Sequence, residues 1–314
     1  MEETPIKSRV LFVDDEPRIL STMRMLFRGK HEMFFADSGA AALELLKTQA
    51  VDVIVSDQRM PGMTGIELLR AAREHNPNAM RILLTGYSDL NAIIGSINEG
   101  EIFRFVNKPW SNDDLITTVS RAVTAARASM AASAHPSGDA APAQTSSAHA
   151  PGVLVLDDDP SVPTQIQVIL GTAFRVFGAT TMEQAVHLLE HDNIGVVISD
   201  TRLQDHPVVS LISTLKQHQP ELVSMILTER ADAGAAIDLI NQGQIYRFIT
   251  KPILDSQCKI AVTSSLRQHH RLAQNPELHK RYEVEKTVEP QPASPVASLL
   301  GRVRSLRSWV ARRN

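Results

Sequence analysis

The chain has 314 residues, of which 43% are hydrophobic and 21% charged, and its formal net charge is −3. This composition is that of an ordinary globular protein of about two domains, and it excludes wholesale disorder and a global attraction to nucleic acid or anionic lipid. Because there is one cysteine (Cys258, expected half-buried on a helix), no signal-like N-terminus and no apolar run of about 18 residues, we expect a cytoplasmic protein without a disulfide framework.

Along residues 7–129, short β-branched and apolar runs alternate with longer segments of helical period, which favours βαβ units and a parallel sheet. The predicted strands are near Arg9 to Val13, Met33 to Ala36, Val51 to Ser56, Met80 to Leu84 and Ile102 to Val106. The predicted helices are near Pro17 to Phe27, Gly39 to Thr48, Gly65 to Glu74, Asp89 to Asn98 and Asn112 to Ala128. This order predicts a small, doubly wound α/β domain.

Residues 130–151 are mostly small and polar, which predicts a flexible linker. Residues 152–273 then repeat the first pattern. The predicted strands are near Val153 to Leu156, Arg175 to Phe177, Gly195 to Ser199, Val223 to Leu227 and Tyr246 to Ile249, and the last helix runs from about Asp255 to Leu272. A polar linker is expected over 274–295, and a basic amphipathic helix over 296–314.

The two halves share one set of polar residues at a constant spacing of 143 positions. The first set is Asp14, Asp15, Asp57, Thr85 and Lys108, and the second is Asp157, Asp158, Asp200, Thr228 and Lys251. Each set falls at the carboxyl ends of predicted strands, where the loops of a parallel sheet converge on one crevice. A lone aspartate after a strand is commonly a helix cap, but a full set repeated in register favours a site.

Three carboxylates in close contact repel one another unless a cation intervenes, and a hard divalent ion such as Mg²⁺ resolves this repulsion. A fixed ammonium and a hydroxyl opposite the metal would then form a cradle for a phosphoryl group. One carboxylate could act as the nucleophile that carries it. The sequence therefore predicts two Mg²⁺-dependent phosphoryl sites.

At these residues both halves resemble the receiver domain of two-component response regulators. The matching segments are VLFVDDEP, IVSDQRMPGMTGIELL, RILLTGYSD and IFRFVNKPW in the first half, and VLVLDDDP, VISDTRLQ, SMILTER and IYRFITKP in the second. The resemblance implies two flavodoxin-like (βα)5 domains. The segments around IFRFVNKPW and IYRFITKP are also similar to receivers of regulators with HD-GYP phosphodiesterase outputs and of hydrogenase-type transcriptional regulators.

The resemblance also implies roles for single residues. Asp57 would accept a phosphoryl group from a histidine kinase or a His-phosphotransfer protein. Asp15 would bind Mg²⁺ directly and Asp14 through water, with the backbone carbonyl of Arg59 as a further ligand. Lys108 would hold a phosphoryl oxygen, and its bond to Pro109 is expected to be cis. The implied switch pair is Thr85 with Phe105 in the first half, and Phe248 in the second.

The second half departs from the first in two places. Met60, Pro61, Gly62 and Gly65 are replaced by Leu203, Gln204, Asp205 and Val208, so this loop is expected to be reshaped. Glu229 follows the second threonine, where the first is followed by Gly86, and its charge should hinder and repel a phosphodonor. We therefore expect Asp57 to be the main acceptor and Asp200 a slower or partner-restricted one.

The roughly forty residues after the second domain are too few for an effector domain, so no enzymatic output and no dedicated DNA-binding domain are expected. The expected output is a phosphorylation-dependent contact with a downstream protein, with a receiver-mediated dimer as one form. The basic tail could dock on protein, contact an anionic membrane or bind nucleic acid. The rival interpretation is a scaffold that uses receiver folds as docking modules without phosphoryl chemistry. His269 and His270 are expected to lie at a solvated helix end.

Overall fold

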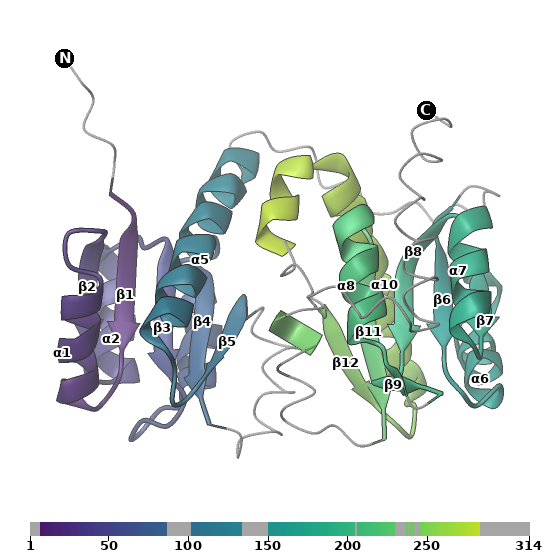
Figure 1. Ribbon diagram of the computed structural model, residues 1–314, viewed down its shortest axis with the longest axis horizontal. Coiled ribbons are helices and arrows are strands. Elements are labelled where there is room, and N and C mark those ends of the chain that lie inside the picture. Colours follow the sequence, from purple (N-terminus) through teal and green to yellow (C-terminus); the bar gives the residue numbers. More distant parts are fainter. Residues whose placement is uncertain are drawn as a thin grey trace. The chain divides into compact units, whose positions relative to one another are not determined.

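The computed structural model describes residues 7–86, 102–133, 150–204, 206–229, 237, 239–241 and 245–282. The chain divides into two compact units, Met1–His135 and Pro136–Asn314. Each unit contains one five-stranded sheet with its own helices (Figure 1).

The first unit has a five-stranded sheet in the order β2-β1-β3-β4-β5, and every neighbouring pair is parallel. Its strands are β1 (Arg9–Val13), β2 (Glu32–Ala36), β3 (Val53–Asp57), β4 (Met80–Thr85) and β5 (Arg104–Asn107). Its described helices are α1 (Pro17–Leu26), α2 (Gly39–Thr48), α3 (Gly65–His75) and α5 (Asn112–Ser133). The chain adds β2 on one side of β1 and then crosses to the other side, where it adds β3, β4 and β5. This change of direction produces a doubly wound sheet with helices on both faces.

Alternation along the strands decides which side chains form each face of the core. Val10 and Phe12 of β1 pack in one buried cluster with Phe27, which follows α1, and Leu115 of α5. This cluster joins α1 and α5 to one face of the sheet, while α2 and α3 cover the other (Figure 1). The helix starts are defined locally: Thr64 and Glu67 form a reciprocal capping box at α3.

The second unit repeats this architecture, with a parallel sheet in the order β12-β11-β8-β6-β7. Its strands are β6 (Gly152–Leu156), β7 (Val176–Ala179), β8 (Ile194–Ser199), β11 (Val223–Thr228) and β12 (Arg247–Thr250). Its described helices are α6 (Ser161–Leu170), α7 (Met182–His191), α8 (Val209–His218) and α10 (Asp255–Gln274), with 3-10 turns η1 (Gly171–Ala173) and η2 (Pro276–Tyr282). An added antiparallel hairpin joins β9 (Arg202–Leu203) to β10 (His206–Pro207).

The predicted α/β fold class is confirmed, and most strand boundaries agree within two residues. Four details differ. Helix α5 continues to Ser133 and is therefore longer than predicted. The expected polar linker after α10 begins instead with η2, because Leu278 is buried and the His279 ring contacts the Leu272 carbonyl at 3.0 Å. Cys258 is fully buried rather than half-buried. His269 is buried rather than solvated, because its ring faces the Glu221 carbonyl.

Several predictions fall outside the described residues: the helix over 89–98, most of the flexible linker over 130–151, residues 283–295 of the polar linker, and the basic amphipathic helix over 296–314. Among the helices that the structure describes, none is long and apolar enough to cross a membrane.

Candidate functional site

The first candidate site lies where three strands of the first sheet end. Asp14 follows β1, Asp57 is the last residue of β3, and Lys108 follows β5. The Lys108 Nζ lies 2.5 Å from Asp57 Oδ1 and 3.3 Å from Asp14 Oδ2. One ammonium group therefore bridges two carboxylates that come from distant parts of the chain.

Backbone amides hold the other oxygen of each carboxylate. The Glu16 N–H donates to Asp14 Oδ1 at 2.9 Å, and the Arg59 N–H donates to Asp57 Oδ2 at 2.8 Å. Both aspartates are buried. Each carboxylate is thus fixed by its own loop on one side and by Lys108 on the other, so its orientation is determined before any ligand binds.

Burial and charge act on the protonation of this cluster. Burial, which outweighs the Glu16 amide and Lys108, raises the pKa of Asp14, and the nearby charge of Asp57 adds to the rise. Burial works against the charge of Lys108, but hydrogen bonding and attraction to Asp57 and Asp14 raise the pKa of Lys108 above its usual value. Lys108 is therefore a permanent cation here, while Asp14 is a carboxylate that gains from additional positive charge.

The other predicted residues of the first half have separate positions. Thr85, the last residue of β4, is buried, and its hydroxyl donates to the Gly86 carbonyl at 3.1 Å. Phe105 is buried on β5, and Asp15 is half-buried directly after Asp14. The Lys108–Pro109 bond is cis, as predicted, and so is Lys251–Pro252.

The donor set of the first half agrees in its chemistry with a hard divalent cation, since it offers carboxylate oxygens and a loop carbonyl. In the part of the chain that the structure describes, no three Asp, Glu, His or Cys side chains already converge as a metal site. Lys108 instead occupies the position between Asp14 and Asp57. These oxygens would hold Mg²⁺ only after Lys108 moved from between the two carboxylates.

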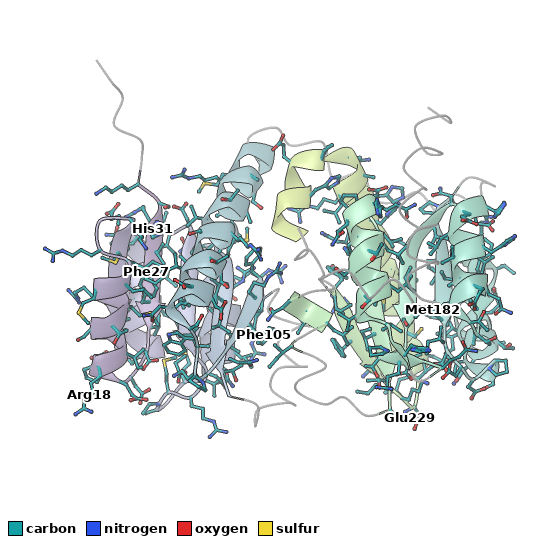
Figure 2. The ribbon with its side chains drawn as sticks, in the orientation of Figure 1. Arg18, Phe27, His31, Phe105, Met182 and Glu229 are labelled. Atoms are coloured by element: carbon teal, nitrogen blue, oxygen red, sulfur yellow. The ribbon has the colours of Figure 1, made fainter. Side chains whose placement is uncertain are left out.

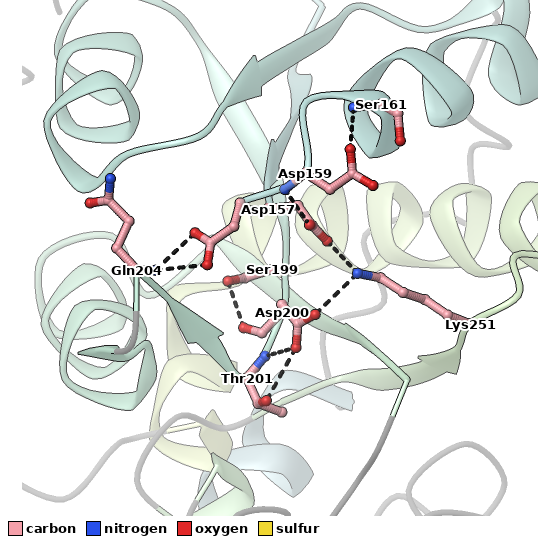
Figure 3. Close-up of polar contacts among 9 residues, drawn as sticks. Asp157, Asp159, Ser161, Ser199, Asp200, Thr201, Gln204 and Lys251 are labelled. Carbon is pink, nitrogen blue, oxygen red and sulfur yellow. Dashed lines mark hydrogen bonds and ion pairs between the residues drawn. The ribbon is translucent and has the colours of Figure 1, made fainter.

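The second half builds the same lysine bridge. The Lys251 Nζ lies 2.7 Å from Asp157 Oδ2 and 3.1 Å from Asp200 Oδ2 (Figure 3). The Asp159 N–H donates to Asp157 Oδ1 at 3.0 Å, as Glu16 does to Asp14 in the first half. Hydrogen bonds to Asp157 and Asp200 raise the pKa of Lys251, although burial opposes this. Thr228 and Phe248 are buried at the corresponding strand positions.

The acceptor position of the second half has different partners. Asp200 Oδ1 accepts from the Thr201 N–H at 2.6 Å and from the Thr201 hydroxyl at 3.1 Å. Its side chain is 23% exposed, compared with 7% for Asp57. The predicted reshaping of the loop is confirmed, because Arg202–Leu203 and His206–Pro207 pair as the antiparallel strands β9 and β10. Glu229 is exposed at one end of the second unit (Figure 2), and Asp205 lies outside the described residues.

Sequence reasoning did not identify Thr201 and Gln204 as contacts of the site. The Gln204 N–H donates to both oxygens of Asp158, at 2.8 and 2.9 Å. One signal was present in the sequence: Gln204 stands at the position of Pro61, and proline has no N–H to donate.

Comparison with known proteins agrees with this geometry. Residues 10–120 and 153–263 both match the response regulator receiver domain. The chain is 42% identical to the hydrogenase transcriptional regulatory protein HoxA of Cupriavidus necator over 119 residues, which are 38% of this chain and 25% of that protein. It is 36% identical to the DNA-binding transcriptional regulator NtrC of Escherichia coli over 88 residues, which are 28% of this chain and 19% of that protein.

Solved structures with similarity include the signal receiver domain of an HD domain-containing protein from Pseudomonas fluorescens, at 32% identity and a TM-score of 0.40. It covers 42% of this chain and 97% of that one. Among the curated relatives, the chain spans about a quarter of the length of HoxA. Two matched segments that together exceed half of the chain, each built as a parallel five-stranded sheet, establish that the protein belongs to the response regulator receiver family, with two receiver domains in tandem.

Proposed function

We propose that the chain is a phosphorelay response regulator that accepts a phosphoryl group on Asp57. The observation that carries this proposal is the bridge from Lys108 to both Asp57 and Asp14. It orients the Asp57 carboxylate and places a permanent positive charge next to the oxygen that would receive phosphorus. The donor would be a histidine kinase or a His-phosphotransfer protein, the donor class of receiver domains.

In the transfer, an Asp57 oxygen would form a bond to phosphorus while the phosphorus–nitrogen bond of the donor phosphohistidine breaks. The electron pair of that bond would return to the imidazole nitrogen. The Lys108 ammonium would move its contact from the Asp57 carboxylate to a phosphoryl oxygen. The Arg59 N–H would hold the Asp57 side chain in its orientation. Bound Mg²⁺, held by Asp14, Asp15, Asp57 and the Arg59 carbonyl, would neutralise the incoming charge.

We propose that the signal leaves the site through Thr85 and Phe105. The Thr85 hydroxyl, which now donates to the Gly86 carbonyl, would turn to a phosphoryl oxygen, and the Phe105 ring would reposition with it. The output would be a contact between a receiver and a downstream protein. The named relatives are transcriptional regulators, and this chain matches them only over a receiver-sized segment.

The test is intact mass spectrometry after incubation with Mg²⁺ and acetyl phosphate or phosphoramidate. Wild type should gain one phosphoryl adduct that Asp57→Asn removes and Asp200→Asn leaves in place. The matched control Asp52→Asn changes a carboxylate outside the cluster, one that accepts from the Arg9 amide, and should keep the adduct. Failure of both small donors and of candidate kinases to modify Asp57 would favour the scaffold function instead.

A further inference from the structure

The loop after the acceptor follows different paths in the two domains, and a steric conflict explains the difference. In the first domain, Gly65 is packed so closely that a Cβ there would overlap the Asp57 carbonyl oxygen. Val208 stands at this position in the second domain and is fully buried. Since a valine cannot take the place of Gly65, helix α8 begins one position later, at Val209, and lacks a side-chain cap.

The rerouted loop brings a backbone donor to the second acidic residue. Strands β9 and β10 pair in antiparallel fashion, and Gln204, directly after β9, has a left-handed conformation (φ 47°). From there its N–H donates to both carboxylate oxygens of Asp158 (Figure 3). The equivalent residue of the first domain, Pro61, offers no such donor, because proline has no N–H.

All three acidic residues of the second domain are therefore satisfied by the protein itself. Lys251 bridges Asp157 and Asp200, the Thr201 N–H donates to the remaining oxygen of Asp200, and the Gln204 N–H donates to Asp158. A divalent cation that recruits Asp158 would compete with the Gln204 N–H, which engages both carboxylate oxygens. In this loop conformation Asp158 is therefore less available to Mg²⁺, although every acidic residue is retained.

We propose that Gln204 is a residue that determines which of the two aspartates is phosphorylated, an inference that rests on the proposed function. Its amide withholds Asp158 from the divalent cation and so directs phosphoryl transfer to Asp57 rather than Asp200. Asp158 and Gln204 are both exposed, so the contact is one that a variant can remove without disturbing the core. A charge-assisted hydrogen bond of this kind corresponds to roughly tenfold weaker cation binding at the second site.

The alternative cause is Glu229, whose carboxylate would repel a phosphodonor. This alternative predicts slow phosphorylation of Asp200 but no weakening of cation binding at the second site, because a further carboxylate attracts Mg²⁺. Cation affinity therefore distinguishes the two explanations without any phosphodonor.

The experiment is a Mg²⁺ titration of the full chain followed by amide NMR, with Arg59 reporting on the first domain and Thr201 on the second. In wild type the second domain should need roughly ten times more Mg²⁺ than the first. Gln204→Pro removes the N–H and cannot adopt the observed φ, so it should bring the two affinities within a few-fold. Gln204→Gly retains the N–H and tolerates this φ, and should resemble wild type.

Val208→Gly provides a second route, since it removes the steric reason for the hairpin and should shift the second-domain affinity in the same direction as Gln204→Pro. Melting curves would verify that each variant is folded. Equal Mg²⁺ affinities of the wild-type domains, or folded Gln204→Pro and Val208→Gly variants with unchanged affinity, would overturn the proposal. If the affinities behave as expected but Asp57 is never phosphorylated, the proposed function fails and the role of Gln204 in cation binding stands.

Discussion

Gly65 lies so close to the main chain of Asp57 that any side chain at position 65 would overlap the Asp57 carbonyl oxygen. A Cβ there would also lie 2.8 Å from Leu83 Cδ1. The first turn of α3 is thereby packed against the end of β3, with the Gly65 N–H donating to the Gln58 carbonyl at 3.0 Å. This close approach fixes the loop whose Arg59 amide orients Asp57.

Gly65→Ala should therefore destabilise the first domain, by about 1–3 kcal/mol, the usual cost of overpacking. The backbone oxygen of Asp57 cannot yield as a flexible side chain would. Denaturant unfolding of the full chain checks this, and Gly86→Ala is the matched control, because a Cβ at Gly86 meets no atom within 4 Å. Equal stability of the two variants would show that α3 shifts without cost.

Asp14→Asn should raise the melting temperature of the first domain in metal-free buffer at pH 7. Burial raises the pKa of Asp14, so the folded state favours the protonated form, and the ionised carboxylate at pH 7 reduces stability. A gain of ~1 kcal/mol corresponds to a rise of about 4 °C in a domain of this size. Differential scanning calorimetry with and without Mg²⁺ measures it.

Glu74→Gln, which removes an exposed carboxylate from α3, is the control for this effect and should leave the melting temperature nearly unchanged. Added Mg²⁺ should stabilise wild type more than Asp14→Asn, because the variant lacks the charge that the cation would neutralise. A lower melting temperature for Asp14→Asn in metal-free buffer would mean that its ion pair with Lys108 outweighs the burial of the charge.

Stability of the second domain should fall as the pH drops below about 6.5. Burial lowers the pKa of His269, whose ring packs on Gly195 and whose Nδ1 lies 2.9 Å from the Glu221 carbonyl oxygen. Because the folded pKa lies below the unfolded one, the unfolded chain binds more protons in this range, and acidification favours unfolding. Glu221 favours protonation of this ring, and His270 and Lys216 oppose it.

Melting temperatures measured between pH 7.5 and 5.5 check this, with an expected loss of a few degrees. His269→Gln should flatten the pH dependence of the second transition, whereas His187→Gln, a change at an exposed histidine of α7, should leave it intact. An unchanged slope in His269→Gln would assign the effect to other groups.

Cys258 should be unreactive in the native protein. Burial on α10, with Asp255 nearby, raises the pKa of its thiol to about 11, so very little thiolate exists at pH 8. A chromogenic disulfide reagent should therefore label the chain only after denaturant is added. Rapid labelling of folded protein would show that α10 opens locally.

The sequence by itself determined the two-domain α/β fold and the approximate position of each strand. Hydrophobic alternation is a local property, and the polar residues at strand ends repeat at a constant spacing of 143. Because parallel strands bring their carboxyl ends together, Asp14, Asp57 and Lys108 could be expected in one place, and they meet there.

Only the tertiary structure decided which oxygen each partner contacts and how the two sites differ. The β9–β10 hairpin accompanies Val208 at the position of Gly65, where a Cβ in the first domain would overlap the main chain at the end of β3. No local pattern encodes that close approach. The bond from Gln204 to Asp158 joins residues 46 positions apart through a backbone N–H. Every residue except proline carries that donor, so the sequence permits the bond, and the path of the loop alone creates it.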